Sequence, residues 1–354
     1  MIFLFVLELP AVIVFYSFYS GLNLTSAVCA SINFILISGI WLVSLFITAL
    51  KNYKTVIQAF LLGTLSTIGA SAILAGKYGA SGIINSFSFG LSVIMALLVT
   101  RILIEYPYAF KSPFRFVRYF RKYWEIALAG LIYNTGIWVD KWIMWFAPEA
   151  DSSFGNMPLY PDYDGAMFLA YLTVVPAMSY FVFAVETNFF EYYVEFYRDI
   201  QSSATLQRIK SNHKKIIGCI IRNSRSLLVL QGTVCLVTLL MAPKIFDFIS
   251  VSFLQLSMFR FGVLGSLFQV FFLFLTILLS YFDNRKATLQ IQTVFFLTNL
   301  IFSFLALKMG FKYYGLGFFL ASSVTFAYAF FITMRYVNKL IFHTFITANK
   351  SVSQ

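Results

Sequence analysis

Long apolar runs recur along the whole chain, and they constrain its fold more than any other feature. Several runs reach the roughly 18 residues needed to cross about 30 Å of hydrocarbon. Of the 354 residues, 60% are hydrophobic and 11% are charged, whereas soluble domains have about 25% charged residues. Because lipid offers the backbone no hydrogen-bond partners, only helices or closed barrels span it. We therefore expect an all-α membrane protein, a polytopic helical bundle.

About ten segments are long and apolar enough to be predicted as membrane-spanning helices. They cover residues 2–20, 24–50, 56–75, 82–104, 124–146, 166–190, 226–248, 259–282, 287–307 and 315–334. Most lysines and arginines fall in alternate connections, which the positive-inside rule makes cytoplasmic. Both termini of this chain are then predicted to be cytoplasmic. The 26 basic residues are explained by this topology, so no nucleic acid is expected as a partner.

Two short patterns each occur twice. KNYKTVIQ at 51–58 corresponds to DNRKATLQ at 283–290, and KYGASGII at 77–84 corresponds to KYYGLGFF at 312–319. The two halves have the same order of elements in the same orientation, which is a recurrent way to build transporters. The repeat predicts two related lobes, the first of which lacks about two N-terminal helices. Chance similarity between apolar segments is the alternative explanation of the two patterns.

This repeat divides the chain into four predicted parts. They are a four-helix N-lobe at 1–104, a cytoplasmic amphipathic linker at 105–123, a six-helix C-lobe at 124–334 that includes a cytoplasmic loop at 191–225, and a cytoplasmic tail at 335–354. The loop at 191–225 is a candidate surface for docking a partner. A helix that simply packs on the lobe would give the same pattern.

Charged residues at membrane depth are costly and are therefore candidates for function. Asp140 and Lys141 are adjacent in the fifth predicted span, and one helical stripe there carries Asn134, Trp138, Lys141 and Trp145. Indole rings can stack on sugar C–H surfaces, while amide and ammonium groups bind hydroxyls. This stripe is a candidate substrate path. Alternatively, the tryptophans form an interfacial belt and Lys141 extends outward to the membrane surface.

Two further carboxylates are substrate-path candidates. Glu186 follows Pro176 in the sixth predicted span, and Glu8 precedes Pro10 in the first. A carboxylate beside a broken helix is a known feature of transporters. An interfacial position for each carboxylate stays open as the alternative.

The predicted linker alternates basic and aromatic residues, which suits a helix lying among lipid headgroups. Arg115, Arg118 and Lys122 are the candidate contacts to anions there. Their target is either plain anionic lipid or a polyprenyl diphosphate.

Enzyme signatures are missing from the sequence. The cysteines Cys29, Cys219 and Cys235 are widely spaced, and neither of the two histidines falls in metal-ligand spacing. No phosphate loop or nucleophile elbow occurs. We expect no catalytic residue, no metal and no cofactor. A membrane-embedded glycan polymerase or ligase using Asp162 and Asp164, or a non-transporting scaffold of a synthase, stays open as an alternative function.

Several segments resemble the PelG family of exopolysaccharide transporters, within the MOP flippase superfamily. The resemblance rests on NTGIWVDKWIMWF at 134–146, FLAYLTVVPAMSYFVFAVETNFFEYYVEFY at 168–197, LKNYK at 50–54, EYP at 105–107 and YYGLGF at 313–318. It implies two lobes of six helices each, although here the first two helices of the N-lobe are absent. It also implies export of a Pel-like polysaccharide, rich in amino sugars, across the bacterial inner membrane. The implied partners are the lipid bilayer, a PelF-like glycosyltransferase, and PelD- and PelE-like membrane proteins.

Overall fold

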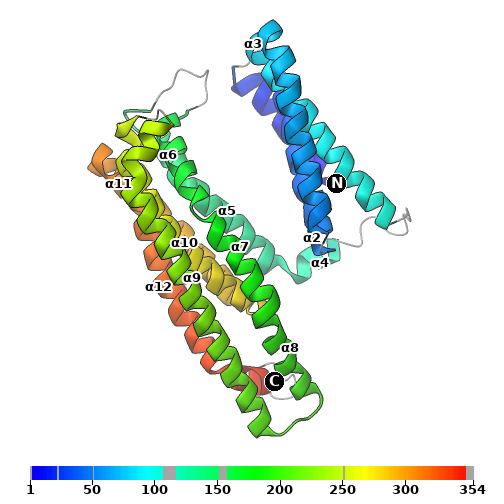
Figure 1. The fold of residues 1–354 in the computed structure, drawn as a ribbon, viewed down its shortest axis with the longest axis vertical. Helices are drawn as coiled ribbons and strands as arrows, with labels where there is room; N and C mark the ends of the chain where they lie inside the picture. Colours follow the sequence, from blue (N-terminus) through cyan, green and yellow to red (C-terminus); the bar gives the residue numbers. More distant parts are fainter. Residues whose placement is uncertain are drawn as a thin grey trace. The chain divides into compact units, whose positions relative to one another are not determined.

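The computed structural model describes residues 2–21, 24–50, 52–106, 117–150, 158–249 and 252–347. All regular elements in these ranges are helices, which confirms the predicted all-α fold class (Figure 1). The chain divides into two compact units. Unit 1 comprises Met1–Arg115 with Ser152–Pro158, and unit 2 comprises Phe116–Asp151 with Leu159–Gln354.

Unit 1 consists of α1 (Ile2–Val14), the π-helical turn η1 (Phe15–Tyr19), α2 (Leu24–Ala49) and α3 (Tyr53–Glu105). The long helix α3 reverses direction at Gly79, whose φ of 58° favours glycine. Its two arms pack closely because Gly63 lies against Gly90 and Ile94. The two spans predicted at 56–75 and 82–104 thus form one helical hairpin.

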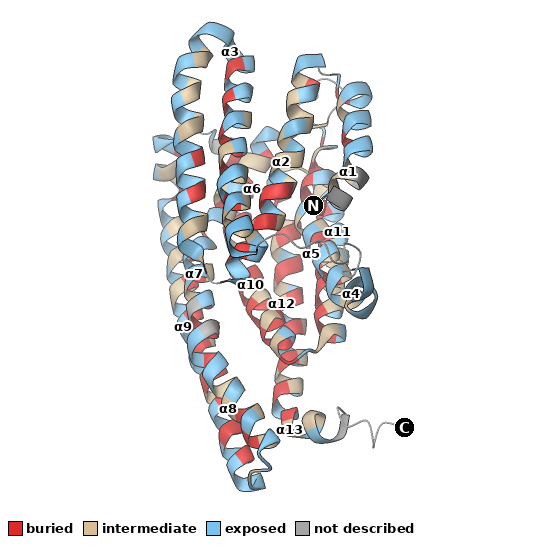
Figure 2. Ribbon diagram, turned by 90° about the vertical axis from the view of Figure 1, so that its right-hand side faces the viewer, coloured by how far each residue is buried: buried red, intermediate tan, exposed pale blue. Residues whose placement is uncertain are grey.

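Unit 2 begins with the short helix α4 (Val117–Lys122) and α5 (Trp124–Met144). It continues with α6 (Pro161–Leu172), α7 (Val175–Phe183), the π-helical turn η2 (Ala184–Phe189), α8 (Phe190–Gln201), α9 (Leu206–Phe248), the 3₁₀ turn η3 (Phe253–Gln255), α10 (Leu256–Tyr281), α11 (Arg285–Met309), the 3₁₀ turn η4 (Phe311–Tyr313), α12 (Leu316–Asn338), α13 (Leu340–Phe342) and the π-helical turn η5 (His343–Thr347). Helix α10 forms the centre of the unit, where it packs against α6, α9 and α12. Helix α11 packs against α5 and α12. Figure 2 shows buried residues along α10 and α12, whereas most of α3 in unit 1 is exposed.

Seven helices of the described residues are long and apolar enough to cross a membrane. The chain is therefore a multi-pass membrane protein, while the number of about ten crossings stays a prediction. One of the seven, α3, folds back on itself and provides two of the predicted crossings. Another, α9, has 43 residues. At 1.5 Å per residue its length is about 64 Å, roughly twice the hydrocarbon thickness. Most of the predicted loop at 191–225 is helical, because α8 and the first half of α9 form a hairpin there.

The two Asn-x-Lys turns have nearly the same geometry. Asn52 has φ −92° and ψ 60°, and Asn284 has φ −84° and ψ 69°. The Asn52 side chain accepts a hydrogen bond from the Thr55 backbone N–H, and the Asn284 side chain accepts one from the Ala287 N–H. Each asparagine thereby satisfies a backbone donor that the first turn of the next helix leaves free. This agreement is what the sequence repeat predicts.

Candidate functional site

Helix α5 is held against α11 by a close contact between backbones. A Cβ atom on Gly136 would lie 2.9 Å from Cδ1 of Phe295, so only glycine fits there. The side-chain amide of Asn299 donates a hydrogen bond to the Gly136 carbonyl at 2.8 Å. On another face of α5, Asn134 is exposed and Trp138 keeps 48% of its surface exposed. One face of α5 is therefore fixed and another is available for binding.

Asp140 and Lys141 form a buried ion pair. Asp140 has 0% and Lys141 has 6% of its surface exposed. The Lys141 Nζ lies 3.1 Å from both carboxylate oxygens of Asp140, and it donates to the Ile137 carbonyl at 2.9 Å. The hydroxyl of Tyr163 donates to Asp140 Oδ2 at 2.9 Å. Both charges are thus paired and hydrogen-bonded, which is what burial of an ion pair requires.

Aromatic rings enclose the ammonium group of Lys141. Its Nζ lies 4.8 Å from the ring centroid of Tyr171 and 5.9 Å from that of Phe318. These two rings meet edge to face at 5.4 Å. A cation beside such ring faces gains electrostatic stabilisation, most strongly where water is excluded. The side chain therefore points into unit 2, and the alternative in which Lys141 extends outward is not what the structure shows.

The predicted stripe on α5 is not uniform in its surroundings. Asn134 and Trp138 are exposed, Trp145 is partly buried, and Lys141 is enclosed. Asn134 donates a hydrogen bond to the Gly130 carbonyl of its own helix at 2.8 Å. The structure therefore brings Asp140 and Lys141 together as a buried pair and separates them from the exposed part of the stripe.

Beyond the end of α5, neutral groups hold three carboxylates. The hydrogen bonds run from Trp145 Nε1 to Asp164 Oδ2 at 2.9 Å, from Gln255 Nε2 to Asp162 Oδ1 at 2.8 Å and from the Tyr314 hydroxyl to Glu149 Oε2 at 2.7 Å. Burial, with the nearby charges of Glu149 and Asp162, raises the pKa of Tyr160 to about 12. Asp164 is therefore hydrogen-bonded and partly buried, whereas Asp162 accepts a hydrogen bond but stays exposed.

The remaining predicted residues lie elsewhere. Glu8 lies in α1 of unit 1, where one of its carboxylate oxygens is buried without a hydrogen-bond partner among the described residues. Glu186 lies in η2, and its side chain falls outside the described part of the structure. Arg118 and Lys122 are exposed on α4, as expected of headgroup contacts, and Arg115 lies outside the described residues.

Sequence reasoning missed Tyr163, Tyr171 and Phe318, which surround the buried pair. They come from α6 and α12, and no spacing along the chain connects them to α5. It also missed Asp199, whose buried carboxylate is 3.0 Å from Arg208 Nε and 2.6 Å from Asn212 Nδ2. The position of Asp199 near the end of α8 was the only available signal. In the described ranges, no group of three or more His, Cys, Asp or Glu residues is placed to hold a metal ion.

Comparisons with known proteins agree on the type of protein. Residues 1–345 match the family model of PelG, an exopolysaccharide exporter (EPS-E). None of the curated proteins matches the chain. Similar solved structures include a MATE protein in its bent conformation, with 12% identity and a TM-score of 0.65 over 95% of this chain and 74% of that one.

Two other solved structures have a similar fold. A MOP superfamily transporter from Pyrococcus furiosus, described by the reverse polarity of its binding pocket, has 12% identity and a TM-score of 0.65 over 96% of this chain and 76% of that one. An outward-facing multidrug resistance MATE transporter has 12% identity and a TM-score of 0.57 over 80% of this chain and 62% of that one. The chain thus spans between 62% and 76% of the length of these structures. At this identity the likeness shows a MOP-type fold.

Proposed function

The chain belongs to the PelG family of exopolysaccharide exporters, and from that premise we propose that it helps to move a polysaccharide across the inner membrane. The cargo is a Pel-like polymer rich in amino sugars, or its precursor, and the mechanism is a flippase-type alternating-access cycle. The observation that carries this proposal is the family match over residues 1–345, together with a MOP-type fold. In such transporters, related bundles rock about a substrate path between them.

The exposed face of α5 is the proposed sugar-contacting surface of unit 2. Trp138 offers a broad indole face, and Asn134 offers a polar group one helical turn away. A cationic amino sugar over an indole ring gains cation–π attraction, and its C–H surface gains apolar contact. Because α5 is fixed on α11 through Gly136, this face moves with unit 2 as a rigid surface.

Asp140 and Lys141 have a positioning role in this proposal. The pair links α5 to Tyr163 of α6 and places Lys141 beside Tyr171 and Phe318. A sugar chain would reach the pair only after these aromatic residues moved apart. Direct contact of the pair with substrate stays a prediction from the sequence, as does the same role for Glu8 and Glu186.

The topology and partners complete the proposal. Both termini of this chain lie in the cytoplasm, where a PelF-like glycosyltransferase with PelD- and PelE-like membrane proteins supplies the polymer. Cysteine labelling tests the topology: Pro148→Cys, at an exposed position after α5, should react from outside, and Ser203→Cys only after permeabilisation. The reverse pattern would overturn the orientation.

Transport is tested with the purified protein in sealed vesicles, to which polymer of known chain length is added from outside. Polymer should accumulate inside the vesicles with its chain length unchanged. Trp138→Ala should reduce accumulation at least several-fold, whereas Trp41→Ala, which alters another exposed tryptophan on α2, should not. Lengthening of the polymer without accumulation would favour the polymerase alternative. If the polymer neither accumulated nor lengthened, the result would favour the alternative of a non-transporting scaffold.

A further inference from the structure

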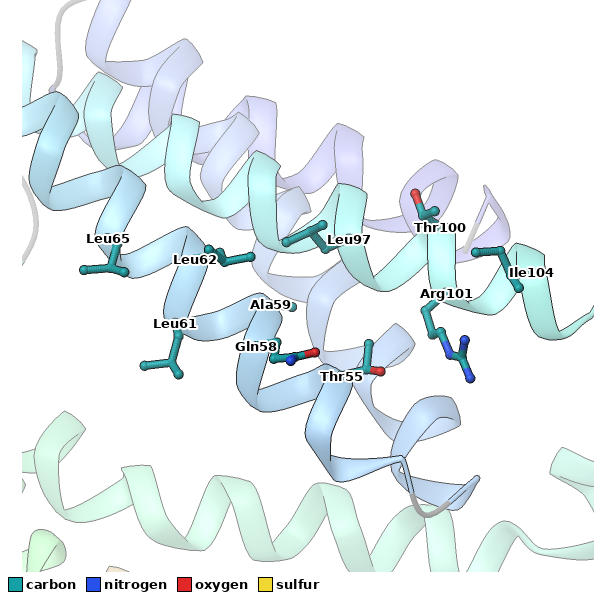
Figure 3. A pocket seen from close by; sticks show the side chains of 10 residues that line it. All are labelled: Thr55, Gln58, Ala59, Leu61, Leu62, Leu65, Leu97, Thr100, Arg101 and Ile104. Atoms are coloured by element: carbon teal, nitrogen blue, oxygen red, sulfur yellow. The ribbon is translucent and has the colours of Figure 1, made fainter.

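The two arms of α3 enclose an open groove on the surface of unit 1. Its volume is about 640 Å³, within the range of small-molecule sites. It is lined by Thr55, Gln58, Ala59, Leu61, Leu62, Leu65, Leu97, Thr100, Arg101 and Ile104. Figure 3 shows the leucine side chains along one part of the groove, with Thr55, Thr100, Arg101 and Ile104 toward its other end.

The apolar part of the groove is strongly exposed for a folded protein. Leu61 keeps 58% and Leu65 63% of its surface exposed. In a chain that spans a membrane, the acyl chains of lipids are a matching partner for such exposed apolar side chains. The groove runs along α3 from Thr55 to Leu65, a rise of about 15 Å, which is half of a hydrocarbon core of about 30 Å. The groove therefore has the length of one acyl chain in one leaflet.

The polar end of the groove carries positive charge. Arg101 is partly exposed there, and Lys54 is exposed one residue before the first groove residue, Thr55. One carboxylate is close, because Glu105 Oε2 lies 3.2 Å from Arg101 Nη2. These three charges leave a net positive end, which is complementary to a lipid phosphate. Thr55 and Thr100 also line the groove toward this end, where the Thr55 hydroxyl donates to Asn52 Oδ1 at 3.0 Å.

The corresponding position in unit 2 shows that a charge is not needed to build this turn. The repeat aligns Lys77 with Lys312, so it aligns Arg101 with Tyr336. The Tyr336 hydroxyl contacts the Phe282 carbonyl, beside the second Asn-x-Lys turn, at 3.5 Å. A neutral side chain thus serves the same turn in unit 2.

The amide of Asn52 lies between two groups that both need its oxygen. One end of the amide is 3.3 Å from the Thr55 backbone nitrogen, and the other is 3.1 Å from Arg101 Nε. The oxygen can face only one of them, so it either caps α3 or accepts from Arg101. An anion that shares the Arg101 guanidinium with Glu105 would leave the Asn52 oxygen to cap the helix, as Asn284 does in unit 2.

From these observations we propose that the α3 groove binds an anionic phospholipid. One acyl chain lies along Leu61, Leu62 and Leu65, and the phosphate lies on the guanidinium of Arg101. The predicted orientation places this end in the cytoplasmic leaflet, which carries anionic lipids. The site consists of unit 1 residues alone and does not depend on transport.

The test uses the purified protein in detergent with phosphatidylglycerol and phosphatidylcholine of identical acyl chains. Native mass spectrometry counts each lipid bound per chain. Phosphatidylglycerol should be preferred, and Arg101→Gln should lower that preference about fivefold, the equivalent of the about 1 kcal/mol that one basic residue contributes near an anionic membrane surface. Arg335→Gln is the matched control, because Arg335 is exposed and adjacent to Tyr336 but lies outside the groove. Equal preference for both lipids in the unaltered protein, or equal losses in the two arginine variants, would overturn the proposal.

Two further measurements locate the acyl chain and the headgroup. Leu62→Trp fills the groove and should abolish the preferential binding, while thermal unfolding shows that the variant remains folded. Inorganic phosphate at millimolar concentration should not displace the lipid, because the acyl chain contributes to binding. Preferential binding that survives Leu62→Trp, or complete displacement by phosphate, would each rule out a lipid held in this groove.

Discussion

The two compact units differ in what their interiors contain. Unit 2 buries a salt bridge, a hydrogen-bonded aspartate at Asp199 and many other polar side chains. In the described part of unit 1, the buried polar side chains are Ser20 and Ser86. Unit 1 also has the smaller apolar core. Both units nevertheless contain the same Asn-capped turn.

This difference shows two ways in which helices associate in a membrane. Without water to drive apolar surfaces together, helices pack through small residues or through polar contacts. The arms of α3 use the first way, with Gly63 against Gly90. Helices α5, α6 and α12 use the second, through Asp140, Lys141 and the groups around them. Substitutions should therefore affect the two units through different mechanisms.

The largest expected effect follows from breaking the buried pair in unit 2. Asp140→Leu leaves Lys141 charged among aromatic rings, which should cost about 3 to 5 kcal/mol of unfolding free energy. Adding Lys141→Met should restore much of the loss, because it removes the unpaired charge. Thermal unfolding in detergent measures both variants. Asp247→Leu, at an exposed aspartate near the end of α9, is the control and should have little effect. If the single and double variants were equally destabilised, the loss would not come from an unpaired Lys141.

The next largest loss of stability is expected where the two arms of α3 meet at Gly63 and Gly90 in unit 1. A Cβ atom on Gly63 would lie 2.9 Å from the Gly90 carbonyl oxygen. Gly63→Ala should therefore cost about 1 to 3 kcal/mol through overpacking. Gly69→Ala is the matched control, since nothing lies within 4 Å of its Cβ position. It should be neutral or stabilising by about 0.5 to 1 kcal/mol. Similar unfolding temperatures for the two variants would argue against close packing of the arms.

A smaller effect on stability is expected from removing the asparagine side chain at either of the two repeated turns. Asn284→Ala removes an uncontested helix cap and should cost about 0.5 to 2 kcal/mol. Asn52→Ala should cost less, because the Asn52 oxygen caps the helix in only one of its two amide orientations and accepts from Arg101 in the other. Thermal unfolding of both variants gives the comparison, and serine at either position retains capping ability and is the control. A larger loss at Asn52 than at Asn284 would contradict this account of the difference.

The smallest effect is a dependence on pH that belongs to unit 2. The pKa of Tyr160 is raised from 10.0 to about 12 in the folded protein. The folded state therefore holds this proton more tightly than the unfolded state. The contribution of this protonated hydroxyl to the free energy of unfolding is fully present below pH 10.0 and is lost as the pH rises toward about 12. Tyr160→Phe keeps the ring and should make unfolding less sensitive to pH between about 10 and 12, as measured by circular dichroism. An unchanged pH profile would mean that Tyr160 does not titrate in this range.

Much of the fold could be predicted because its signals are local. Every predicted span falls in helical segments, and the Asn-x-Lys patterns correspond to turns with nearly equal dihedral angles. The reversal at Gly79 falls between the two predicted spans that it joins. Less of the candidate site could be predicted. The adjacency of Asp140 and Lys141 indicated a pair, but the stripe placed Lys141 with the exposed Asn134 and Trp138.

The sequence by itself determined that lipid surrounds the chain, which segments form helices, where the repeated turns lie and which family the chain belongs to. Each of these depends on composition or on residues close together in the chain. Only the tertiary structure decided that Lys141 points inward. That choice depends on Tyr163 and Tyr171, brought to α5 by the α6 segment, and on Phe318, brought by α12. A buried charge is stable only where distant groups supply its hydrogen bonds and ring contacts, and their convergence is a property of packing.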